Sequence, residues 1–154
     1  MQLNSRPAGD DATGQRKRKV ARVLLADADL ASRLTLKTLL CAAGYSVDGA
    51  ASASEAVARL DTQEYQLVLA DLRSESEEAG PRLLAYARQK DFRPATALIS
   101  SRMSEMTASA ASSGSTNSVV RMSDDNVSYL LARVAELISH RADRRIRQSL
   151  RRAS

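Results

Sequence analysis

The sequence is poor in aromatic residues and has a single cysteine. Aromatic residues make up 3% of the chain, with no tryptophan and one phenylalanine. The hydrophobic core must therefore be built from leucine, valine, isoleucine and alanine. Cys41 has no second cysteine with which to form an internal disulfide. Because it lies in an apolar helical stretch, we expect it to be a small buried hydrophobic residue.

Signatures of membrane segments and of several enzyme classes are also missing. The chain has no run of about 18 apolar residues, as a membrane-spanning helix requires, and no apolar segment typical of a signal peptide follows its first charges. It lacks a Gly-x-Gly-x-x-Gly phosphate loop, a Ser-His-Asp set and Cys/His metal spacing. Its only histidine, His140, lies in a basic helical stretch, where we expect an exposed or packing residue. We predict a soluble cytoplasmic protein that is not a nucleotide-dependent or hydrolytic enzyme.

Positive charge is concentrated at the two ends of the chain. Residues 1–22 hold six basic and two acidic residues, and residues 132–154 hold seven basic and two acidic residues. Residues 23–131 hold ten basic and fourteen acidic residues, so the central part is acidic. We predict a disordered basic leader over residues 1–19, a globular domain over 20–139 and a basic helical extension over 140–154.

The basic extension leaves several interpretations open. Its arginines suit contact with nucleic-acid phosphates or an anionic membrane surface. Because no helix-turn-helix or zinc finger accompanies them, sequence-specific DNA binding is not predicted. A solvated extension, or part of a linker or coiled coil, is the preferred interpretation. The spacing of Ile146 and Leu150 also allows a homodimer through the extended helix.

Two apolar segments end in carboxylates. Residues 22–26 are followed by Asp27-Ala28-Asp29, and the continuous apolar run of residues 65–70 ends in Asp71. Short apolar runs of this kind are typical of strands buried on both faces in a parallel sheet. The carboxyl ends of such strands form the ligand-binding edge of the sheet. A cluster of carboxylates at that edge favours a hard cation such as Mg²⁺, although Asp27, Asp29 or Asp71 also suits a helix cap.

The remaining segments complete an alternation of strands and helices. Further strands are predicted over residues 45–50, 95–100 and 118–121. Helices are predicted over residues 29–43, from Ser52, over residues 81–90, over part of 103–117, and from Ser123 onward. Gly44 is expected to end the first helix, and Ser52 with Glu55 to form a capping box. Five such units predict a three-layer α/β/α sandwich around a five-stranded parallel sheet.

The order strand-Asp-x-Asp followed by strand-Asp resembles the receiver domain of bacterial two-component response regulators. The resemblance covers approximately residues 21–136 and implies a flavodoxin-like topology. It implies that Asp71 accepts a phosphoryl group from a partner histidine kinase or phosphotransfer protein and that a downstream protein partner is then engaged. It also implies a Mg²⁺ site, whose ligands are Asp27, Asp71 and the backbone carbonyl of Arg73, with Asp29 as a further candidate one residue away from the family's second acid.

The resemblance also assigns residues to the phosphoryl oxygens. Ser100 matches the serine or threonine that ends the fourth strand, with Ser101 as an alternative in register, although a strand-end hydroxyl also bonds the backbone. Arg121 stands where the family has lysine, and we expect it to supply the same charge with a different geometry. No basic neighbour of Asp71 is expected to engage its carboxylate.

Four features depart from the family pattern. Ala28 replaces the second of two adjacent acids, Met122 replaces the proline after the lysine, and Ser118 takes the place of an aromatic residue. The loop of residues 72–80 is acidic. Two hypotheses therefore remain: a phosphate-accepting receiver with a weakened Mg²⁺ site, or a pseudo-receiver that binds protein partners independently of phosphorylation.

Overall fold

The computed structural model describes residues 20–100, 118–121 and 127–153 of the chain. The predicted leader of residues 1–19 and the helix expected within residues 103–117 lie outside these ranges. The predicted start of the last helix at Ser123 lies outside them as well.

Five parallel strands form one sheet. They are β1 (Arg22–Asp27), β2 (Ser46–Ala50), β3 (Leu67–Asp71), β4 (Ala95–Ser100) and β5 (Ser118–Arg121). Their order across the sheet is β2-β1-β3-β4-β5, so β3 lies at the centre and β2 at one edge. This is the flavodoxin-like order, and it confirms the predicted sheet.

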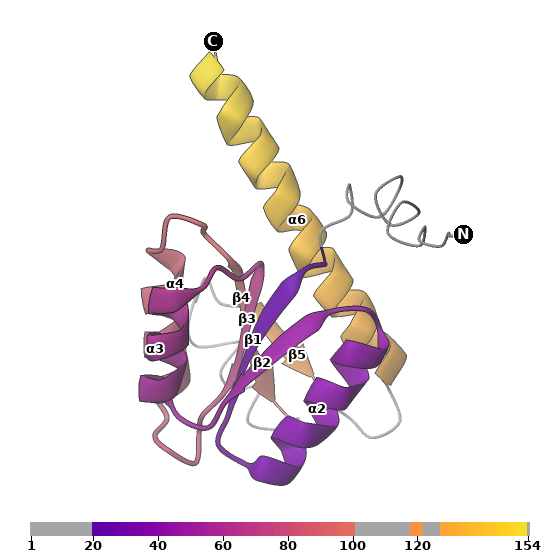
Figure 1. Ribbon diagram of the computed structural model, residues 1–154, viewed down its shortest axis with the longest axis vertical. Helices are drawn as coiled ribbons and strands as arrows, with labels where there is room; N and C mark the ends of the chain where they lie inside the picture. The colour runs from indigo at the N-terminus through magenta and orange to yellow at the C-terminus, as the bar shows by residue number, and fades with distance from the viewer. Residues whose placement is uncertain (1–19, 101–117, 122–126, 154) are drawn as a thin grey trace, which may run out of the picture.

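Helices cover both faces of this sheet (Figure 1). The described helices are α2 (Leu30–Ala42), α3 (Ala53–Thr62), α4 (Ala79–Arg88) and α6 (Val127–Ala153). Buried side chains of α2 and α6 pack on one face, and those of α3 and α4 pack on the other. The predicted three-layer sandwich is therefore confirmed.

Local signals in the sequence set several helix ends. Gly44 follows α2 with a φ of +105°, a conformation that favours glycine and ends the helix there. At α3, the hydroxyl of Ser52 accepts a hydrogen bond from the backbone N–H of Glu55, and the Glu55 carboxylate accepts one from Ala51. Ser52 therefore caps α3 as predicted, whereas the Glu55 side chain reaches back to Ala51, one residue before the N–H that a capping box engages. The following helix, α4, begins at Ala79, two residues before the predicted start at Pro81.

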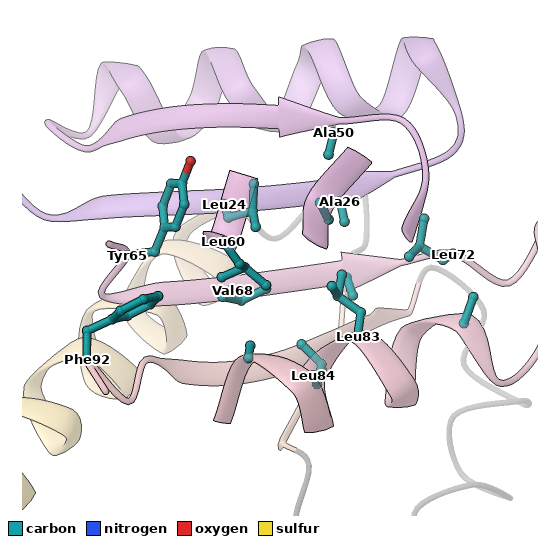
Figure 2. Packing of buried hydrophobic residues seen from close by; sticks show 14 residues of the cluster. Leu24, Ala26, Ala50, Leu60, Tyr65, Val68, Leu72, Leu83, Leu84 and Phe92 are labelled. Carbon is teal, nitrogen blue, oxygen red and sulfur yellow. The ribbon is translucent and has the colours of Figure 1, made fainter. Parts of the chain in front are cut away.

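The core consists of two clusters, one on each face of the sheet. Figure 2 shows the cluster under α3 and α4, where Tyr65 and Phe92 supply the aromatic side chains and alanines, leucines and Val68 from the strands and both helices supply the rest. Cys41 is not part of either cluster. It is exposed, which corrects the prediction of a buried cysteine, because α2 turns the adjacent Leu40 and Leu36 toward the sheet.

The last helix extends well past the body (Figure 1). Its buried residues Leu130, Val134 and Leu137 recur at spacings of four and three and pack against the sheet. The helix continues without a break to Ala153. This agrees with the helical extension predicted over residues 140–154, and the division between domain and extension after residue 139 stays a prediction.

Candidate functional site

The two strand-end carboxylates lie side by side. Asp27 ends β1 and Asp71 ends β3, and the two residues are partners in the register of these neighbouring strands. Just beyond the strand end, the N–H of Ala28 donates to the carbonyl of Asp71 across 3.3 Å. The buried runs before each aspartate carry both carboxyl groups to the same edge of the sheet. The prediction that Asp27 and Asp71 end neighbouring strands at one edge of the sheet is therefore confirmed.

Asp27 is buried and held by a local network. Its side chain is only 2% exposed. One carboxylate oxygen accepts from the N–H of Asp29 at 3.0 Å, and the other accepts from the Ser32 hydroxyl at 2.6 Å. The guanidinium of Arg33 donates to the Asp27 carbonyl at 2.7 Å. Both carboxylate oxygens of this buried side chain are therefore hydrogen-bonded, as buried polar groups usually are.

Sequence reasoning missed the two residues from α2 in this network. Ser32 and Arg33 lie in the first turn of the helix that follows Asp27. A hydroxyl and a guanidinium in the first turn after a strand-end aspartate are placed to reach back to it. The positions of Ser32 and Arg33, five and six residues after Asp27, were the signal in the sequence from which these contacts could have been predicted.

Asp71 is held differently. Its side chain is 18% exposed, and one carboxylate oxygen lies 3.6 Å from the Arg73 side-chain nitrogen. Burial and the nearby Asp27 charge raise the pKa of Asp71, and the Arg73 guanidinium offsets part of that rise. The expectation that no basic neighbour engages Asp71 is wrong, because the turn after β3 brings Arg73 back toward it.

Asp29 caps α2. Its carboxylate accepts a hydrogen bond of 2.8 Å from the N–H of Ser32, and its backbone is extended, as at a helix N-cap. The capping alternative raised for this residue is therefore confirmed. Its predicted part in a metal site stays a prediction.

The other two predicted site residues end the neighbouring strands. Ser100 and Arg121 are partners in the register of β4 and β5, which places their backbones at the same edge of the sheet as Asp27 and Asp71. Their side chains lie outside the described part of the structure, and so does Ser101. Their predicted roles stay predictions.

Several solved structures share this architecture. A CheY-like response regulator receiver domain protein from Methanospirillum hungatei is 21% identical, with a TM-score of 0.66 over 82% of this chain and 99% of that one. A response regulator from Thermotoga maritima is 23% identical, with a TM-score of 0.62 over 79% of this chain and 99% of that one. The chain has the fold of a receiver domain.

The receiver fold alone does not fix an activity. A structure from Rhodopirellula baltica described as an adenylate cyclase is 18% identical, with a TM-score of 0.71 over 88% of this chain and 100% of that one. No protein-family model matches the chain, and no curated protein matches it in sequence. Function must therefore be argued from the site.

Two acidic side chains of the loop after β3 make contacts with neighbouring helices. The Glu75 carboxylate accepts from the N–H of Ala53 at 3.1 Å, at the start of α3. Glu78 pairs with Arg82 one turn further along α4, at 2.9 Å. Two of the acids that depart from the usual receiver pattern are thus directed to helix ends and to a cation.

The receiver fold implies a divalent metal, and the donor atoms at this edge suit Mg²⁺. Carboxylate oxygens come from Asp27 and Asp71, and the backbone carbonyl of Arg73 comes two residues after the end of β3. Mg²⁺ is commonly held by one or two carboxylates while it keeps several waters. No group of three or more His, Cys, Asp or Glu side chains that could enclose a metal occurs in residues 20–100, 118–121 and 127–153. The residues therefore fit a hydrated Mg²⁺ held by few protein ligands.

Proposed function

We propose that this chain is a receiver that accepts a phosphoryl group on Asp71 from a partner histidine kinase or phosphotransfer protein in the cytoplasm and signals through protein contacts. One observation carries the proposal: Asp71 ends the central strand directly beside the buried carboxylate of Asp27. Two adjacent carboxylates repel each other, so the pair favours a bound cation. This is a role in signalling, and we do not expect turnover of a metabolite.

The transfer needs a nucleophile, charge neutralisation and donors for the phosphoryl oxygens. An Asp71 carboxylate oxygen attacks the phosphorus, and a new oxygen–phosphorus bond forms as the bond to the donor imidazole nitrogen breaks. The leaving imidazole nitrogen is then protonated. Mg²⁺, held by Asp27, Asp71 and the Arg73 carbonyl, would neutralise charge on the phosphoryl group. Ser100 and Arg121 would donate to its remaining oxygens.

The proposal is tested by incubation with a small acyl phosphate and Mg²⁺, followed by intact-mass measurement. A phosphoryl adduct is expected that depends on Mg²⁺ and is absent from Asp71→Ala. Asp61→Ala, which removes an exposed aspartate on α3, is the matched control and should retain the adduct. No adduct on the folded wild-type protein, together with no binding of beryllofluoride, would exclude the phosphoacceptor role.

Arg73 is expected to compete with the metal. Its guanidinium lies at the Asp71 carboxylate, where it already supplies a positive charge. In Arg73→Ala that charge is lost while the backbone carbonyl stays, so Mg²⁺ should bind more tightly, by about threefold to tenfold. The shift of the unfolding temperature with Mg²⁺ concentration measures this change. Arg82→Ala, on the exposed side of α4, should leave Mg²⁺ affinity unaltered, and equal affinities in all three proteins would contradict the competition.

A second candidate function is that of a pseudo-receiver, which binds protein partners whether or not it is phosphorylated. The specific observation in its favour is that contacts within the protein already engage the carboxylates that would hold the metal. Both Asp27 oxygens accept hydrogen bonds, and Arg73 faces Asp71. This candidate predicts no adduct and no stabilisation by Mg²⁺, so the same mass and unfolding measurements distinguish it from the first.

A further inference from the structure

The part of α6 that extends past the body has two chemically distinct sides. Ala142, Ile146 and Leu150 recur every fourth residue and so share one side. Ser139, Ser149 and Ala153 fall on the same side at 3.6 residues per turn. The arginines occupy the rest of the circumference: Arg141, Arg144, Arg145, Arg147, Arg151 and Arg152. We call the side of Ala142, Ile146 and Leu150 the apolar seam.

The apolar seam is directed away from the core-packed side of the helix. Ile146 lies roughly 120° to 180° around the helix axis from Leu130, Val134 and Leu137. The side chains of Ile146 and Leu150 are 58% and 64% exposed. Neither residue therefore serves the packing of α6 on its own sheet.

The extension is fixed to the body at its base. The Arg141 guanidinium donates to the carbonyls of Phe92 and Arg93, at 2.6 and 3.1 Å, and Arg145 donates to the Phe92 carbonyl at 2.9 Å. These two arginines continue the core-packed side of the helix by spacings of four. The contacts hold the helix in a set direction, which presents the seam at a fixed position.

A groove lies at the foot of the seam. It has a volume of about 710 Å³, and Ile138, Arg141 and Ala142 of α6 line it. Val20, Arg22 and Gln66 also line it, and Val20 is largely exposed. Ala142 belongs to both the groove and the seam, and the polar lining of the groove holds two arginines, two glutamines, a threonine and one acid, Glu64.

We propose that the seam and its groove bind an acidic amphipathic helix of a partner protein. A narrow apolar stripe with charges on both sides is the pattern of a helix–helix seam. Residues 140–154 carry six arginines against one aspartate, so the partner's flanking residues should be glutamate or aspartate. Pairing with a second copy would instead bring two strongly basic helices together.

Two other partner classes fit the surface less well. A helix that lies in a membrane interface usually presents a wide face with aromatic or several large apolar side chains. Residues 130–154 contain no aromatic residue, and the seam has only two large apolar ones. Nucleic-acid phosphates would engage the arginines and leave Ile146 and Leu150 exposed.

The test uses the full chain and a labelled synthetic helix of about four heptads, with leucine at the core positions and glutamate at the flanking positions. Fluorescence anisotropy should show binding of this peptide and none of a matched peptide with flanking lysines. Ile146→Ala/Leu150→Ala should weaken binding about tenfold or more. The double variant should keep its helix content in circular dichroism, because alanine is the best helix former.

A matched control removes two other exposed leucines. Leu30→Ala/Leu34→Ala, on α2, takes away side chains that are 59% and 54% exposed and should leave peptide binding unchanged. The proposal is overturned if the acidic peptide does not bind, or if the seam variant binds it as tightly as the wild type. If the peptide does not bind but the chain self-associates through the seam, the partner is a second copy and the proposal is overturned. If the peptide does not bind but phosphatidylserine vesicles do, in a seam-dependent way, the partner is a membrane and the proposal is again overturned. Binding only to random duplex DNA would assign the arginines to phosphates instead.

Discussion

Replacing Leu69 with alanine is expected to lower the free energy of unfolding by about 2–5 kcal/mol. Leu69 is completely buried in the central strand β3, with Leu25 of β1 and Ala97 of β4 as its register partners. Hydrogen-bonded strands on both sides limit how far the backbone can move to fill the space. Because small domains have total stabilities of about 5–15 kcal/mol, this loss is a large fraction of the total.

Urea unfolding followed by circular dichroism measures the effect. Leu34→Ala serves as the control, since it truncates the same side chain on the exposed side of α2 and should change stability by no more than about 0.5 kcal/mol. A cost below about 1 kcal/mol for Leu69→Ala would contradict its position in a rigid central strand.

The second prediction concerns the hydroxyl of Tyr65. This side chain is buried, and its hydroxyl donates to the Asp48 carboxylate at 2.6 Å. The same carboxylate oxygen lies 3.4 Å from Arg22. In Tyr65→Phe, the carboxylate loses its best donor while it stays partly buried, so stability should fall by about 1.5–3 kcal/mol near neutral pH.

The loss should depend on pH in a defined direction. Burial alone would raise the pKa of Asp48, but the Tyr65 hydroxyl and the Arg22 guanidinium outweigh it and lower the pKa in the folded protein. The stabilisation is therefore present above the unfolded-state value, about 3.9, and is lost as pH falls through the folded value. The difference in the free energy of unfolding between the wild type and Tyr65→Phe should be largest above about pH 5 and should decrease in acid.

Tyr86→Phe is the matched control for this experiment. The Tyr86 hydroxyl also donates to an aspartate, Asp61, but both side chains are exposed. Its removal should change stability by about 0.5 kcal/mol or less, since water replaces the lost partner. Equal costs for the two tyrosines, or a gap that widens in acid, would show that the buried hydrogen bond does not carry the stabilisation.

The sequence predicted most of the features that depend on local pattern. The apolar runs before Asp27 and Asp71 marked two strands buried on both faces, and the alternation of elements indicated a parallel sheet with helices on both sides. Gly44 and the Ser52–Glu55 pair marked helix ends, because φ and capping depend on a few adjacent residues. The same signals placed the two carboxylates together.

Features that depend on side-chain reach or helix rotation were not predictable in this way. Arg73 pairs with Asp71 because of the conformation of the turn after β3. Cys41 was assigned to the core because α2 has leucines around much of its circumference, including Leu30 and Leu34, which prove to be exposed. In such a helix the apolar pattern does not determine which residues face the sheet.

Because Arg141 attaches α6 to the body, the helix beyond Arg141 moves as a unit with the part that packs on the sheet. Its body half packs against β4 and β5, the strands that end in Ser100 and Arg121. From Arg141 to Ala153 the helix extends about 18 Å, at 1.5 Å per residue. A tilt of about 10° at the base would therefore move the far end by about 3 Å, so small rearrangements of this sheet edge are magnified at the tip.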